Sequence, residues 1–217
     1  MTILEEAIRY LGYKGAKPSE EVVAGLTEAI EEVRVAAVPK HIYKAFPVKF
    51  KEDGAWIETY AFPGQTLAKH IADCEQAVLL AATLGVGVDR LLRKYSVLNL
   101  TKAVYVQAAA AALLEEYCDG LQKELEAYYQ KQGLYVLPRF SPGYGDLPLE
   151  SQRALFALLK PQKQLGLMLT DNFMMVPEKS VTAIVGVSKV QRGCHKQGCA
   201  MCGHLQCSYR RAEGSAT

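Results

Sequence analysis

Apolar side chains recur at helical spacing in several stretches of the chain, and the first stretch follows a clear start signal. Thr2 and Glu5 form a capping-box sequence, and the apolar positions that follow predict a helix ending at Gly12 or Gly15. A second helix is predicted to begin at Ser19. The same spacing predicts further helices over residues 88–95, 100–131 and 150–159.

Shorter apolar runs bounded by turn residues predict strands. Residues 42–50 and 55–60 are joined by Glu52-Asp53-Gly54, which is a hairpin signal. Further strands are predicted over residues 78–84, 166–170 and 181–187. Because helices and strands alternate irregularly and hairpins outnumber βαβ units, we predict the α+β class, with a twisted antiparallel or mixed sheet flanked by helices.

The composition is that of a folded soluble protein. Of the 217 residues, 50% are hydrophobic and 22% are charged. No apolar run approaches the roughly 20 residues that span a bilayer, and the N-terminus lacks a secretory signal, so we expect a cytoplasmic protein with no membrane contact. The net charge is +2, and the chain lacks the basic face with interleaved aromatic residues typical of nucleic-acid binding.

The segment Arg139-Phe-Ser-Pro-Gly-Tyr-Gly-Asp-Leu-Pro148 has the residue types of a small-ligand loop. Arg139 can bind a carboxylate through two parallel hydrogen bonds, and Gly143 lets the backbone approach a ligand closely. Tyr144 offers an aromatic face to a cationic centre. A ligand with both a carboxylate and a positive centre, such as S-adenosylmethionine, would suit this set.

The sequence admits two other interpretations. The Arg139 loop can equally be a rigid turn in which the guanidinium pairs with a surface acid. A hydrolase has little support, because neither His41 nor His70 has an acidic or nucleophilic partner at a telling spacing. The chain also contains no phosphate-binding loop, G-x-S-x-G or HExxH motif.

The C-terminal segment from residue 188 onward is rich in cysteine and is predicted to be a tail distinct from a domain over residues 1–187. Its C-x4-C-x2-C-x4-C cysteines are Cys194, Cys199, Cys202 and Cys207. Four soft sulfur ligands suit zinc or an iron–sulfur cluster, and His195 or His204 could replace one thiolate in a zinc site. The alternative is a flexible redox-active tail. Cys74 and Cys118 are expected to be small buried apolar residues.

Three stretches resemble the activation domain of cobalamin-dependent methionine synthase. The loop Arg139-x-x-x-Gly143-Tyr144 is similar to that family's R-x-x-x-G-Y signature, and residues 169–182 are similar to its L-T-E-S-x-A-M-x-P-x-x-S-V-S stretch. Residues 109–119 resemble its alanine-rich helix, in which Glu116 best matches an acid near the ligand. The whole chain resembles a stand-alone bacterial form of the domain.

The resemblance implies a function. In that family the signature loop holds S-adenosylmethionine, so Arg139, Gly143, Tyr144 and Glu116 would bind this cofactor. The domain would cap the cobalamin of a partner module and hold the methyl donor over an inactive cobalt, while a flavodoxin-like donor supplies one electron. The transfer would be metal-centred, within a methyltransferase system for methionine biosynthesis, and would need no catalytic side chain.

Three departures from the family pattern stand out. Residues 145–148 are Gly-Asp-Leu-Pro where the fused domain has Pro-Ala-Cys-Pro, and residues 184–189 lack a tyrosine that the fused domain carries near its end. The cysteine tail is absent from the fused domain. The sequence is also compatible with an alternative function: an iron–sulfur or zinc-containing accessory or electron-transfer protein that docks on a corrinoid protein.

Overall fold

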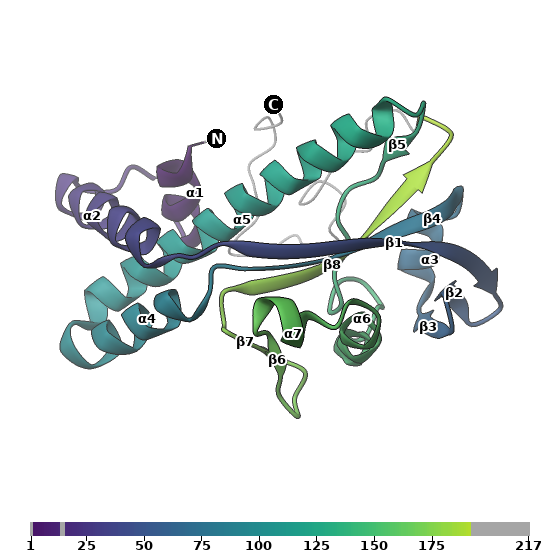
Figure 1. Cartoon of the computed structure of the whole chain (residues 1–217). Helices are drawn as coiled ribbons and strands as arrows, with labels where there is room; N and C mark the ends of the chain where they lie inside the picture. The colour runs from purple at the N-terminus through teal and green to yellow at the C-terminus, as the bar shows by residue number, and fades with distance from the viewer. Residues whose placement is uncertain (1, 14–15, 192–217) are drawn as a thin grey trace. The chain divides into compact units, whose positions relative to one another are not determined.

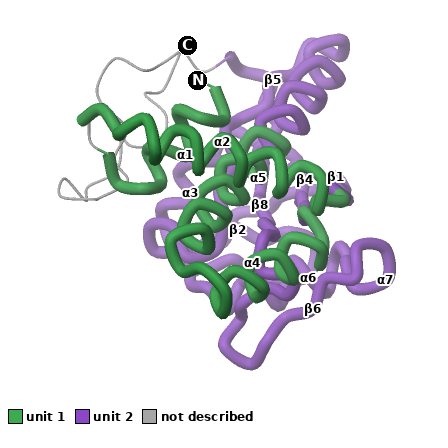
Figure 2. The backbone as a smooth tube through the Cα atoms, turned by 90° about the vertical axis from the view of Figure 1, so that its left-hand side faces the viewer, with its two compact units in different colours: residues 1–38, 84–117, 193–217 green, residues 39–83, 118–192 purple. Residues whose placement is uncertain are grey.

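The structure is a computed structural model that describes residues 2–13 and 16–191 (Figure 1). Contacts between Cα atoms divide the described part of the chain into two compact units, one from Met1–Val38 and Leu84–Tyr117 and the other from Pro39–Thr83 and Cys118–Arg192 (Figure 2). The elements are α1 (Ile3–Tyr10), α2 (Glu20–Ala36), β1 (Lys40–Lys51), β2 (Gly54–Ile57), β3 (Tyr60–Pro63), α3 (Gln65–His70), β4 (Cys74–Thr83), α4 (Val86–Leu98), α5 (Leu100–Gln130), β5 (Tyr135–Val136), the 3-10 turn η1 (Leu149–Ser151), α6 (Gln152–Leu159), α7 (Pro161–Leu165), β6 (Met168–Leu169), β7 (Met175–Val176) and β8 (Ser180–Ser188).

The first unit is helical, and α1, α2 and α5 begin where the sequence predicts, whereas α4 begins at Val86, two residues earlier. The Thr2 hydroxyl accepts the Glu5 N–H at 3.2 Å, and the Glu5 carboxylate accepts the Thr2 N–H at 2.8 Å, which confirms the capping box. Ser19 caps α2 by accepting the N–H of Val22. The apolar faces of α1, α2, α4 and the first part of α5 form one core.

Polar contacts also join three helices of this unit. Lys102 on α5 forms ion pairs with Glu28 and Glu32 on α2, and the Tyr95 hydroxyl on α4 donates to Glu32. The hydrogen bonds that Lys102 donates to Glu28 and then to Glu32 raise its pKa. The cation therefore stays protonated and keeps the three helices connected.

The start of α4 makes a close approach to α2 that only glycine permits. A Cβ added to Gly87 would lie 2.1 Å from the carbonyl oxygen of Ala36, which is backbone and cannot rotate away. Gly120 in α5, by contrast, has no atom within 4 Å of an added Cβ. These two helical glycines form a matched pair.

We expect Gly87→Ala to lower the free energy of unfolding by about 1–3 kcal/mol, because the backbone must shift to relieve the clash. Gly120→Ala should raise it by roughly 0.5–1 kcal/mol, because alanine loses less conformational entropy in a helix. Denaturant titration of both variants measures the difference. Equal stabilities would mean that the Gly87 contact is not tight.

The second unit is built on a six-stranded sheet in the order β3-β2-β1-β4-β8-β5. Every neighbouring pair is antiparallel, so the sheet is antiparallel rather than mixed. The predicted hairpin is confirmed: β1 and β2 pair up to Lys51 and Gly54, with Glu52 and Asp53 between them. A separate two-stranded ribbon is formed by β6 and β7.

The two faces of this sheet carry different helices because strand side chains alternate. On β4, Leu79 and Ala81 join a core with α3, α6 and α7, whereas Val78 joins Leu125 and Tyr129 of α5. Figure 1 shows α6 and α7 on one side of β1 and β8 and the second half of α5 on the other. The sheet therefore lies between α5 and the short helices.

Several short elements differ from the sequence prediction. β3, β5, α7 and β7 have at most five residues each, too few to show a period, and were not predicted. The predicted strand over 166–170 is only Met168–Leu169, because β7 offers two residues to pair with it. Helix α6 ends at Leu159 as predicted, since Lys160 adopts a left-handed conformation, and Pro161 then begins α7.

Candidate functional site

The backbone before and after Arg139 is attached to the edge of the sheet. The Leu137 N–H donates to the Gly186 carbonyl at 2.8 Å. Phe140 exchanges two hydrogen bonds with Ile184, at 2.9 and 2.8 Å. Arg139 lies between these two attachments to β8, so the position of its Cα is fixed by the sheet.

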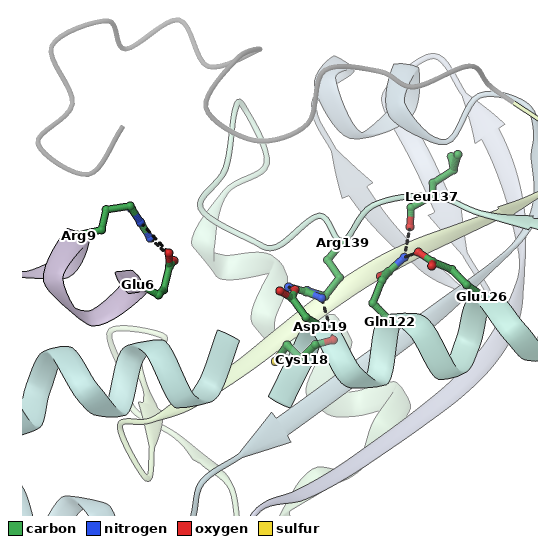
Figure 3. A network of polar contacts seen from close by, with 8 residues as sticks. All are labelled: Glu6, Arg9, Cys118, Asp119, Gln122, Glu126, Leu137 and Arg139. Carbon is green, nitrogen blue, oxygen red and sulfur yellow. Dashed lines mark hydrogen bonds and ion pairs between the residues drawn. The ribbon is translucent and has the colours of Figure 1, made fainter. Parts of the chain in front are cut away.

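The Arg139 side chain reaches α5 (Figure 3). Its guanidinium donates to the Cys118 carbonyl at 2.8 Å and to the Asp119 carboxylate at 2.7 Å, and the side chain is only 19% exposed. The surface acid that the rigid-turn interpretation required is therefore present, as Asp119. One turn further along α5, the Gln122 amide donates to the Leu137 carbonyl at 3.1 Å and strengthens the same attachment.

The Gly-Tyr-Gly turn that follows is tight and outward-facing. Gly143 and Gly145 have φ values of +90° and +58°, a conformation that favours glycine. The Gly143 N–H donates to the Leu147 carbonyl at 2.9 Å, and the Leu147 N–H donates to the Tyr144 carbonyl at 3.1 Å. Tyr144 is 68% exposed, so most of its surface faces solvent.

Asp146, just after the turn, joins this loop to α3. This role was not predicted from the sequence. Its carboxylate accepts the backbone N–H groups of Gln65 at 2.7 Å and Thr66 at 3.0 Å. Hydrogen bonds from the Thr66 hydroxyl and then from these N–H groups hold the pKa of Asp146 below its usual value. An aspartate in a turn is a signal for capping, but nothing in the sequence identified a partner 80 residues away.

The acid expected on the alanine-rich helix belongs to the other compact unit. Glu116 lies on α5 and is exposed, whereas Glu115 is half-buried. Burial raises the pKa of Tyr10 to about 12, and the nearby Glu115 adds to that shift. Because Glu115 faces Tyr10, Glu116 is the better candidate for contact with a ligand, and this role stays a prediction.

The structure leaves the predicted metal site untested. Cys194, Cys199, Cys202 and Cys207 lie outside the described residues. Among the described residues, no group of three or more His, Cys, Asp or Glu side chains is arranged to hold a metal ion. Cys74 and Cys118 are both buried, as expected.

Comparison with known proteins identifies the family. The family model described as "Vitamin B12 dependent methionine synthase, activation domain" matches residues 63–193, which is more than half of the chain. The chain belongs to this family. The matched region begins just before α3 and contains both the Arg139-x-x-x-Gly143-Tyr144 loop and the similar stretch at 169–182.

A solved structure has the same fold as this activation-domain chain. It is described as the crystal structure of the MetH reactivation domain bound to AdoHcy, and it matches with a TM-score of 0.61 at 17% sequence identity. The match covers 88% of this chain and 78% of that chain, which confirms the predicted α+β fold. No curated protein matches the chain. None of the helices in the described part of the activation-domain chain is both long and apolar enough to cross a bilayer.

Proposed function

We propose that this chain binds S-adenosylmethionine at the Arg139 loop and serves as a reactivation module for cobalamin held by a methionine synthase or another corrinoid protein. The observation that carries the proposal is the family match over residues 63–193, because it includes the whole Arg139-x-x-x-Gly143-Tyr144 signature. The fold shared with an AdoHcy-bound reactivation domain gives further support, since AdoHcy is what remains of S-adenosylmethionine after methyl transfer.

The geometry of the loop suggests a role for each residue. A ligand carboxylate would take the place of Asp119 on the Arg139 guanidinium, and the Asp119 side chain, which is 60% exposed, would turn to solvent. The Gly143 backbone, which carries no Cβ, and the exposed Tyr144 ring would lie against the rest of the ligand. Glu116 stays the proposed acid of the family's alanine-rich helix.

The work of this chain would be to bind, orient and shield the methyl donor. Cobalamin held by the partner would supply the nucleophilic metal, and a flavodoxin-like protein is the proposed source of the one electron that it would need. The chain needs to contribute no acid, base or covalent nucleophile, because positioning and exclusion of water carry the catalytic effect. This agrees with the lack of a catalytic constellation in the sequence.

Two measurements test the proposal. Calorimetric titration of the purified chain should show S-adenosylmethionine binding at one site, with AdoHcy as a competitor. A methionine synthase fragment with inactive cobalamin but no activation domain should then recover methionine formation only when the chain, S-adenosylmethionine and a reductant are all added. A chain that binds neither S-adenosylmethionine nor AdoHcy would contradict the proposal.

The cysteine tail would add a separate metal site. We propose that residues 188–217 form a unit distinct from residues 1–187 and bind zinc or an iron–sulfur cluster through Cys194, Cys199, Cys202 and Cys207. The four cysteines fall within fourteen residues, and a thiol density of this kind favours metal over disulfides in the cytoplasm, where we expect the protein to act.

A further inference from the structure

The start of α3 and the end of the Gly-Tyr-Gly turn are joined by two hydrogen bonds to one carboxylate. One carboxylate oxygen of Asp146 accepts the Gln65 N–H at 2.7 Å, and the other accepts the Thr66 N–H at 3.0 Å. Both oxygens are therefore used, and each satisfies a backbone N–H that has no partner inside the helix. A carboxylate held by two donors cannot turn without losing one of them, so the loop has one preferred position against α3.

Two glycines let the loop and α3 approach this closely. A Cβ on Gly64 would lie 2.7 Å from a carboxylate oxygen of Asp146 and 2.8 Å from its carbonyl oxygen. A Cβ on Gly145 would lie 3.0 Å from the side chain of Thr66. Both glycines have positive φ, at +107° and +58°. The contact thus depends on matching features in two segments that are distant in the sequence.

The other end of α3 contacts the loop on the opposite side of Arg139. The Nε2 atom of His70 lies 2.9 Å from the Pro138 carbonyl oxygen, and because a carbonyl can only accept, His70 donates this hydrogen bond. The His70 ring also packs against Phe140, with ring centroids 5.5 Å apart. One short helix therefore contacts residues 138 and 140 at its end and Asp146 at its start.

We propose that α3 is a brace that fixes the ligand loop from Pro138 to Asp146, with Asp146 and His70 as positioning residues. The proposal rests on the proposed function, in which this loop binds S-adenosylmethionine. Bracing a loop before the ligand arrives reduces the conformational entropy lost on binding, which is how residues without ligand contact raise affinity. It also gives a role to Asp146, which stands where the family's fused domain has a different sequence.

The test is a double-mutant cycle read by S-adenosylmethionine affinity. Asp146→Ala removes the acceptor, and Gln65→Pro removes one of its two donors at the first position of α3, where proline is well tolerated. We expect each variant to weaken binding by about three- to tenfold, and the double variant to be no weaker than Asp146→Ala alone. Asp146→Asn, which keeps one acceptor oxygen, should recover part of the loss. Asp53→Ala, at an exposed aspartate that also accepts an N–H but lies in the turn between β1 and β2, should bind like wild type.

Some outcomes would overturn the brace. Wild-type affinity in Asp146→Ala, or losses in Asp146→Ala and Gln65→Pro that simply add, would mean that the contact does not position the loop. If Asp146→Ala does not fold, Gln65→Pro alone decides, because unchanged affinity in that variant also rejects the brace.

A ligand-independent measurement separates the brace from the proposed function. Hydrogen exchange at the Gly143 and Leu147 amides should accelerate in Asp146→Ala even if the wild-type chain binds no S-adenosylmethionine. Absence of wild-type binding would thus reject the proposed function alone. Unchanged exchange at both amides would reject the brace alone.

Discussion

Arg139→Ala should weaken S-adenosylmethionine binding by about 2–5 kcal/mol, which is the usual cost of removing one partner of a buried, hydrogen-bonded charge pair. The guanidinium is mostly shielded from water and is already oriented by the Cys118 carbonyl and Asp119, so little further ordering is needed when a ligand carboxylate arrives. Arg139→Lys should be intermediate, because an ammonium keeps the charge but not the two parallel hydrogen bonds. Calorimetric titration gives the affinities.

A ligand without the carboxylate shows whether the effect is direct. Wild type and Arg139→Ala should bind decarboxylated S-adenosylmethionine with similar affinity, because neither can form the carboxylate contact. Arg34→Ala, which removes an exposed arginine paired with Glu31, is the matched control and should bind like wild type. Equal losses of affinity for both ligands in Arg139→Ala would assign Arg139 to holding the loop rather than to the ligand.

Removing two cysteines from the middle of the tail should abolish metal binding. Structural zinc in zinc-finger peptides binds with an apparent free energy of roughly 10–16 kcal/mol. The loss of two of the four thiolates should remove much of that binding free energy. We therefore expect Cys199→Ser with Cys202→Ser to contain no stoichiometric metal after anaerobic purification. Metal analysis and colour give the result, because an iron–sulfur preparation is brown and a zinc preparation is colourless.

The control for this variant is Gln197→Ser with Gln206→Ser, which changes two tail residues without removing a thiolate and should keep its metal. S-adenosylmethionine affinity should stay near the wild-type value in both double variants, because the Arg139 loop lies elsewhere in the sequence. Wild-type protein that is metal-free and does not respond to zinc, or to iron with sulfide, would leave a redox-sensitive tail as the better interpretation.

Much of the fold could be predicted because the longer elements are determined by residues that are close together in the sequence. The Thr2 capping box, the Ser19 cap and the apolar period of α5 depend on neighbours three or four residues away. The hairpin at Glu52-Asp53-Gly54 is equally local. Elements of two to five residues, such as β5 and α7, are formed by their tertiary partners instead, so no period in the sequence could reveal them.

The candidate site divides in the same way. Arg139, Gly143 and Tyr144 lie within six residues, so their spacing could be recognised as one motif, and the family match now includes it. Asp119 and Asp146 were not recognised, because each works through a contact with a segment 20 or 80 residues away. The Arg139–Asp119 pair also shows that the two interpretations of the loop are compatible, since a surface acid can orient the guanidinium before a ligand binds.

The sequence by itself determined the α+β class, the positions of the long helices and the family signature, because each depends on residue types at short fixed spacings. Only the tertiary structure decided that the sheet is entirely antiparallel, that Arg139 is attached to α5, and that α3 contacts both sides of the ligand loop. These are contacts between distant segments. They depend on how strands pair and on where glycines permit backbones to meet, and neither is encoded in any short stretch of the chain.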